Sequence, residues 1–225
     1  FIYAQSMSRP DVVAQAPTDS QALTSAEIES LKFICEEEKL SRDVYRTLGD
    51  RWNLRSFSNI NQAEQRHMDQ VKTLMQSYGI ADPVVSDKVG VFANPQLAAM
   101  YTKLVQRGQT SLLEALMVGA LIEETDIKDL RDRLNASANP QIKATYGYLL
   151  QGSYNHLQAF VRQIERQGGS YTPQVLSQQE LAEILAQGHR SGWRYFSYQV
   201  DVAVEPIAST FISIKQIATT MSRNF

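Results

Sequence analysis

Apolar residues recur three and four positions apart over four long stretches of the chain, which is the pattern of helices that bury one face. These stretches cover roughly residues 25–48, 57–78, 111–134 and 140–167, and shorter helices are predicted at 95–108 and 178–187. Thr24 and Ser111 are each followed three positions later by a glutamate, the spacing of a capping box, so they mark two of the helix starts. Gly49 is expected to end the first helix.

The connection between the second and third long helices is unusually long, running from about residue 80 to 109. Simple up-and-down bundles use short loops, whereas ferritin-like bundles contain one long crossover. The sequence therefore predicts an all-α fold, a ferritin-like four-helix bundle with a long crossover, over residues 23–188. Residues 1–22 are expected to form an extended N-terminal arm or signal remnant, and residues 189–225 a C-terminal arm with β character.

All four buried stripes are apolar at both ends and polar in the middle. The polar positions are Glu38, Glu64 with His67, Glu123, and His156. An unpaired carboxylate in a helical core costs several kcal/mol or more, and these stripes contain no lysine or arginine. A metal cation is the simplest compensating charge. The only cysteine is Cys35, which excludes a cysteine-based zinc site, so oxygen and nitrogen ligands suited to iron or manganese remain.

Several neighbouring residues have two interpretations. Three adjacent glutamates point in different directions on a helix, and only Glu38 falls on the stripe, so Glu36 and Glu37 are expected to be exposed or to support the ligands. Glu124 and Asp126 flank the stripe of the third long helix and can face solvent. Tyr45 is either a core residue or a catalytic candidate.

The segments "EKLSRDVY", "EQRH", "IEETD" and "SYNH" resemble the ligand segments of the ferritin-like di-iron carboxylate superfamily, such as rubrerythrins and bacterioferritins. They are most similar to an uncharacterised ferritin-like family, over about residues 24–167. The resemblance implies two iron ions, with manganese as an alternative, and a set of metal ligands comprising Glu38, Glu64, His67, Glu123 and His156. Ser153 stands where the superfamily usually has a further carboxylate, and Asp126 is the candidate to replace it.

The resemblance implies an oxidoreductase that reacts with a small oxidant, dioxygen or peroxide, as a ferroxidase or peroxidase, with Tyr45 as the catalytic candidate. The alternative is an exported structural or self-assembling protein that uses the bundle as a scaffold. Residues 193–204 alternate between apolar and polar in a strand pattern, and pairing with residues 1–22 of a neighbouring copy would make a homo-oligomer.

Charge and hydropathy limit which other partners and which location we expect for the protein. With 22 basic and 24 acidic residues, the formal charge of −2 favours neither nucleic acid nor an anionic membrane surface as a partner. No run approaches the roughly 18 apolar residues of a membrane span. The small residues Ala14 and Ala16 after "FIYAQS" resemble the end of a secretory signal, which favours an extracytoplasmic protein over a cytoplasmic one.

Overall fold

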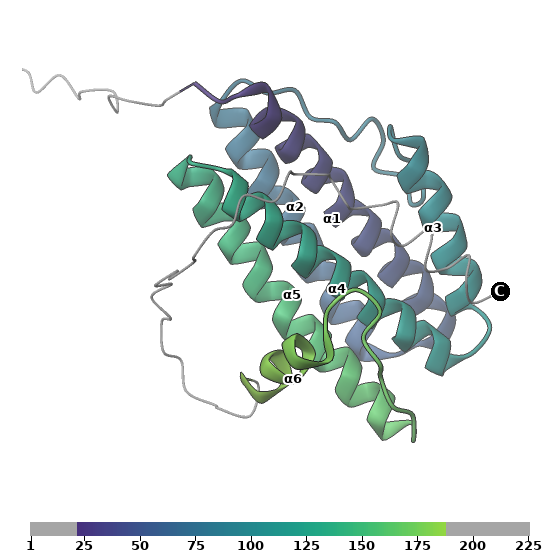
Figure 1. The fold of residues 1–225 in the computed structure, drawn as a ribbon. Helices are drawn as coiled ribbons and strands as arrows, with labels where there is room; N and C mark the ends of the chain where they lie inside the picture. The colour runs from purple at the N-terminus through teal and green to yellow at the C-terminus, as the bar shows by residue number, and fades with distance from the viewer. Residues whose placement is uncertain (1–21, 188–225) are drawn as a thin grey trace, which may run out of the picture.

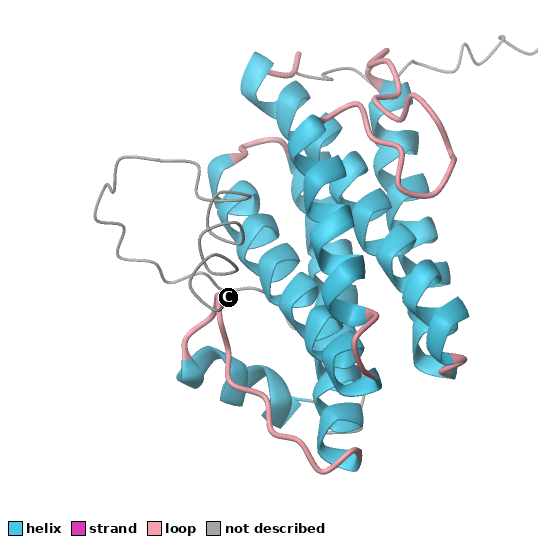
Figure 2. Cartoon of the chain, turned by 90° about the vertical axis from the view of Figure 1, so that its right-hand side faces the viewer, coloured by secondary structure: helices cyan, strands magenta, loops and turns pink. Residues whose placement is uncertain are grey.

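The computed structural model describes residues 22–187, and this part of the chain consists of helices and connecting loops, with no strand (Figure 2). The helices are α1 (Ser25–Trp52), α2 (Arg55–Ser77), α3 (Pro95–Gly108), α4 (Leu112–Ala136), α5 (Pro140–Arg166) and α6 (Gln178–Gln187). The all-α prediction is confirmed for these residues. The C-terminal arm and its strand at residues 193–204 lie outside the described residues, as do residues 1–21 of the N-terminal arm.

The helix starts follow from the capping residues. The Thr24 hydroxyl accepts a hydrogen bond from the Glu27 N–H while the Glu27 carboxylate accepts one from the Thr24 N–H, so the predicted capping box is present. The Ser111 side chain caps α4 in the same way by accepting from the Glu114 N–H. The expected stop at Gly49 is wrong, because α1 continues to Trp52 and ends at Asn53, which adopts the left-handed conformation (φ 50°).

The four long helices lie side by side, with α3 on one flank and α6 across one end (Figure 1). Most of the close packing joins α1 to α2 and α4 to α5, and α2 against α5 and α1 against α4 hold the two pairs together. Helix α3 packs against both α1 and α4, so the crossover that contains it covers one side of the core. The core is therefore built from two helix pairs that face each other.

A buried ion pair fastens the crossover to α1. Lys39 and Asp43 are both fully buried and paired with each other. The Lys39 ammonium also donates to the Lys88 carbonyl, and Asp43 accepts from the Gly90 N–H, so both charges hold the loop backbone. A second loop contact comes from Glu36, whose carboxylate accepts from the Ala93 N–H. Glu36 is 7% exposed, so the expectation that it is exposed is wrong: its carboxylate anchors the crossover.

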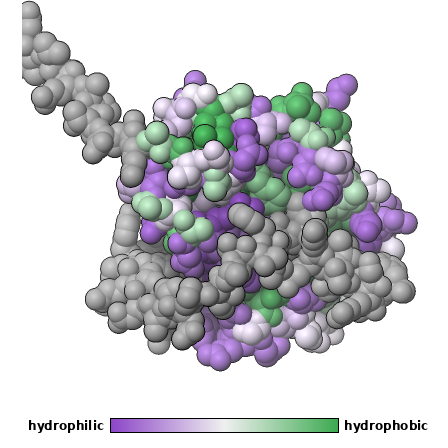
Figure 3. All heavy atoms as spheres, turned by 45° about the horizontal axis from the view of Figure 1, so that its top comes forward, coloured by the Kyte–Doolittle hydropathy of each residue, from purple (hydrophilic) through white to green (hydrophobic). Residues whose placement is uncertain are grey.

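The other end of the chain is anchored by Glu124, which is fully buried and accepts hydrogen bonds from the N–H groups of Gln174 and Val175. The expectation that it faces solvent is wrong, because the segment leading into α6 passes over it. On the face drawn in Figure 3, hydrophilic and hydrophobic residues are interspersed. Within residues 22–187, no helix combines the length and apolar character of a membrane span.

The first prediction concerns the buried ion pair. Asp43→Ala should lower the free energy of unfolding by roughly 3–5 kcal/mol, because it leaves the Lys39 ammonium buried without its partner. The control is Asp87→Ala, which removes an exposed carboxylate paired with Arg42 and should cost less than about 1 kcal/mol. Urea denaturation measures both, and equal losses would contradict the assignment.

Candidate metal centre

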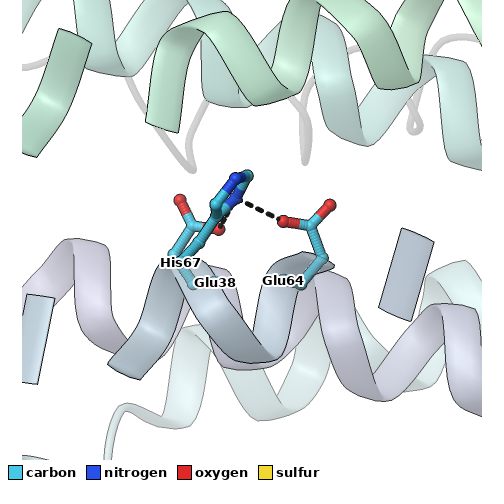
Figure 4. Close-up of side chains that lie close together, drawn as sticks. All are labelled: Glu38, Glu64 and His67. Atoms are coloured by element: carbon cyan, nitrogen blue, oxygen red, sulfur yellow. Dashed lines mark hydrogen bonds and ion pairs between the residues drawn. The ribbon is translucent and has the colours of Figure 1, made fainter. Parts of the chain in front are cut away.

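Carboxylates and imidazoles from the four long helices meet in the middle of the core. They are Glu38 on α1, Glu64 and His67 on α2, Glu123 on α4 and His156 on α5. The most exposed of them, His156, is only 9% exposed. Figure 4 shows the His67 ring between the carboxylates of Glu38 and Glu64, with all three side chains pointing away from α1 and α2 toward the facing helices. The centre is thus enclosed by protein.

These side chains form two groups that share one residue. In the first, His67 Nδ1 lies 3.2 Å from Glu38 Oε2 and 2.8 Å from Glu64 Oε2. In the second, His156 Nδ1 lies 2.8 Å from Glu64 Oε1 and 3.5 Å from Glu123 Oε1. Within each group, one ligand atom from each residue lies within 4.8 Å of the others, which is close enough to hold a metal ion. Glu64 therefore contributes one carboxylate oxygen to each group.

The second group leaves polar atoms unsatisfied. Glu64 Oε1, Glu123 Oε2 and His156 Nδ1 are buried and have no hydrogen-bond partner among the described residues. Glu64 Oε1 and His156 Nδ1 approach to 2.8 Å, but their alignment is not that of a hydrogen bond. Buried polar atoms without partners are rare because each costs about 1–3 kcal/mol. Their convergence fits a cation between them.

For each of these groups, burial shifts the pKa in one direction and the contacts with oppositely charged groups shift it in the other. Burial lowers the pKa of His67, but the carboxylates of Glu38 and Glu64 outweigh this effect and raise it to about 11. The same competition, against Glu64 and Glu123, raises the pKa of His156 to about 10. Burial raises the pKa of Glu38 and of Glu123 to about 7, despite the adjacent imidazoles. Without a bound metal ion, the two protonated imidazoles thus provide the positive charge among these residues.

Glu64 behaves differently from the other two carboxylates. Its burial alone would raise its pKa, but contacts with both His156 and His67 hold the pKa well below its usual range. Glu64 is therefore the carboxylate that stays ionised between two cationic partners. A bridging position between two metal ions makes the same demand on a carboxylate.

Residues 27–188 match the family described as "Uncharacterized protein domain (DUF2202)". The chain belongs to the DUF2202 family. The uncharacterized protein MJ0754 of Methanocaldococcus jannaschii is 46% identical over 172 residues, covering 76% of this chain and 93% of the relative. The crystal structure titled "hypothetical protein MJ0754 from Methanococcus jannaschii DSM 2661" superimposes with a TM-score of 0.73 over 76% of this chain and 98% of that chain.

Two further candidates of this DUF2202 chain lie beside the groups. Asp126 is buried and accepts a hydrogen bond from the Ser41 hydroxyl, but it belongs to neither three-residue group. Burial and the nearby Glu37 carboxylate raise its pKa well above the usual range. The Tyr45 hydroxyl donates to Glu123 Oε1 at 2.7 Å, so the tyrosine contacts a member of the second group directly.

The expectation that Glu37 is exposed is wrong, because this residue is buried. It is 5% exposed, lies near Asp129 and Arg133, and belongs to neither three-residue group. Burial and the Asp129 charge raise the Glu37 pKa well above its usual range. Nothing in the stripe pattern reveals this, because Glu37 faces α4 one position away from the stripe of α1.

The raised pKa values of the two imidazoles in this DUF2202 core predict how the stability of the chelator-treated protein depends on pH. Because their pKa values are raised above the ordinary value of about 6.5, their stabilising effect is complete below that pH and is lost as pH rises toward 10–11. The raised pKa values of Glu38 and Glu123 act in the same direction from about pH 4.5 to 7. The free energy of unfolding of the chelator-treated protein should therefore fall between pH 6 and 10.

The control is the same protein with saturating Mn²⁺. Metal binding needs neutral imidazoles and ionised carboxylates, so the stabilisation conferred by Mn²⁺ should grow over the same pH range. Chemical denaturation at several pH values measures both curves. A chelator-treated protein that becomes more stable toward pH 10 would show that the imidazoles are not held as cations in the core.

Proposed function

We propose that this DUF2202 protein is a ferritin-like four-helix bundle that holds two iron ions, with manganese as the alternative metal, and reacts with dioxygen or peroxide. The single observation that carries the proposal is the arrangement of two three-ligand groups that share Glu64. Two-metal sites hold their ions about 3.5–4 Å apart, a spacing that a bridging carboxylate can span. Ferroxidase and peroxidase chemistry use the same ligand types.

The donor set favours iron or manganese over other metals. Each group offers two carboxylates and one imidazole, and the described core has no thiolate near them, since Cys35 is buried with its pKa raised to about 12 by burial. Mixed oxygen and nitrogen ligands suit iron and manganese, and the unsatisfied atoms of Glu64, Glu123 and His156 fit a metal ion. Bound here, such metals would supply one-electron redox chemistry toward the oxidant.

The chain's own residues prepare the site for that chemistry. Glu64 keeps its charge between the two groups, and Glu38 and Glu123 add one carboxylate to each. Tyr45 donates to Glu123 and thereby fixes the orientation of that carboxylate. The rings of Phe57 and Phe160 pack around Tyr45 with centroids 6.1 and 5.2 Å away, which limits access of water on this side.

The proposed site is asymmetric because α5 contributes one imidazole and no carboxylate. Ser153 lies one turn before His156, and its hydroxyl donates back to the Leu149 carbonyl of the same helix. Asp126 on α4 is the carboxylate that we assign to the sixth position, since it is buried one turn beyond Glu123 and forms no ion pair with a cationic side chain of the described residues. Its present partner, the Ser41 hydroxyl, is a weak one at 3.2 Å.

The proposal is tested by metal analysis and by oxidant consumption. Protein stripped with chelator and dialysed anaerobically against Fe²⁺ should bind about two equivalents and then consume dioxygen or peroxide. Glu64→Gln should lose most of the metal at both positions, because it replaces the one carboxylate that both groups share. Glu37→Gln is the matched control, since Glu37 is an equally buried glutamate that belongs to neither group, and it should keep two equivalents.

The outcomes separate the enzyme from the scaffold. Equal metal content in Glu64→Gln and Glu37→Gln would show that Glu64 is not a shared ligand. A well-folded wild type that binds no Fe²⁺ or Mn²⁺ would overturn the proposal and favour the structural or self-assembling alternative. Metal without oxidant consumption would favour a metal that only stabilises the fold.

A further prediction addresses Tyr45. Tyr45→Phe should keep both metal equivalents but slow Fe²⁺ oxidation by about 10-fold or more, because Glu123 loses the hydroxyl that orients it. Tyr146→Phe is the control: this tyrosine is also fully buried, but its hydroxyl bonds to Ser30 instead. Stopped-flow measurements compare the oxidation rates of the two variants, and identical rates would show that Tyr45 has no part in the reaction.

A further inference from the structure

Helix α5 approaches the His67 ring so closely that only glycine fits at the point of contact. A Cβ atom built on Gly152 would lie 2.4 Å from both Cε1 and Nε2 of His67, far inside any real carbon contact. The ring therefore rests against the backbone of α5 with this edge. Its other nitrogen, Nδ1, faces Glu38 and Glu64.

A second residue of α5 forms a wall beside the same ring. Tyr148 lies one turn before Gly152, and its ring meets the His67 imidazole edge-on with centroids 5.6 Å apart. Tyr148 is 52% exposed, so this wall stands at the surface of the α2–α5 contact. The imidazole thus lies in a slot on α5, with one edge against Gly152 and with Tyr148 beside the ring.

We infer that Gly152 is a positioning residue that holds His67 in the orientation required for the first metal group. This inference rests on the proposed function, because it names the residue on which one of the two proposed metal positions depends. A methyl group at position 152 would have to displace the ring, and staggered rotamers leave a helical histidine few alternatives. Rotation of the ring away from α5 takes Nδ1 away from Glu38 and Glu64.

The slot positions a ligand of the first metal group and none of the second. His156 projects from α5 itself and meets Glu64 and Glu123, so its position does not depend on the distance between Gly152 and α2. The loss expected from a larger residue at 152 is therefore specific to the group of Glu38, Glu64 and His67. A general loosening of the helices would instead weaken both groups.

The test compares Gly152→Ala with Gly147→Ala in the full chain. Both glycines lie within α5, so both substitutions bring the same gain in helix propensity, but a Cβ at Gly147 would meet nothing closer than Leu134 at 4.0 Å. Chelator-stripped proteins are titrated with Mn²⁺ by equilibrium dialysis. Gly152→Ala should weaken the same one of two equivalents that His67→Ala is expected to weaken, by about 10–100-fold, while Gly147→Ala should match the wild type.

A metal-free measurement keeps the inference separate from the proposed function. Ring nitrogen NMR of the stripped protein should show His67 signals shifted in Gly152→Ala and unchanged in Gly147→Ala, with His156 signals shifted far less. If the wild type binds no Mn²⁺ while the His67 signals shift as described, the proposed function fails and the positioning of the ring stands. Unshifted His67 signals, or loss of both equivalents together, would overturn the inference.

A double variant covers the case in which Gly152→Ala folds poorly. If the new methyl group clashes only with the imidazole, then adding Gly152→Ala to His67→Ala should raise the melting temperature, as Gly147→Ala is expected to raise that of the wild type. A drop in the melting temperature of the double variant below that of His67→Ala would show that the methyl group meets something other than the imidazole, and the inference would fail.

Discussion

The buried carboxylate of Glu64 is the constraint on which the rest of the core depends. It is 1% exposed and meets an imidazole with each oxygen, at 2.8 Å on both sides. A buried charge of this kind persists only when opposite charge surrounds it. One of its two imidazole contacts, His67, comes from α2 itself, and the other, His156, comes from α5. The packing of α2 against α5 is thus tied to an electrostatic requirement as well as to apolar burial.

The glutamates next to the site show how one short segment meets three different demands. In the run from Glu36 to Glu38, the last faces the centre, the middle faces Asp129 on α4, and the first accepts a backbone N–H of the crossover. Successive residues of a helix are about 100° apart, so these directions are unavoidable. What varies is whether solvent or protein lies in each direction. Here the crossover lies beside Glu36, α4 beside Glu37, and α2, through His67, beside Glu38.

That distinction explains which features the sequence could predict. Helical periodicity and capping residues located the helices and brought Glu38, Glu64 and Glu123 to one level, because both signals are local. The burial of Glu36 and Glu124 could not be predicted in this way. It depends on the paths of two loops, from 78 to 94 and from 167 to 177, and loop paths carry no periodic signal. The expected helix end at Gly49 failed because this glycine has a packing role inside α1. Its lack of a side chain makes room for Phe57, whose Cβ would lie 3.1 Å from an added methyl group.

The two imidazoles are held by different means, although they lie stacked with centroids 5.6 Å apart. His67 comes from α2 and is confined by the backbone of α5 at Gly152, so its position depends on the distance between two helices. His156 stands on α5 and meets Glu123, whose own orientation is set by the Tyr45 hydroxyl, so its position depends on a chain of polar contacts. Steric confinement tolerates almost no change of residue size, whereas a hydrogen-bonded chain can adjust by small rotations. The half of the centre that contains His67 is therefore the more rigid one, and the half that contains His156 and Glu123 has more room to rearrange.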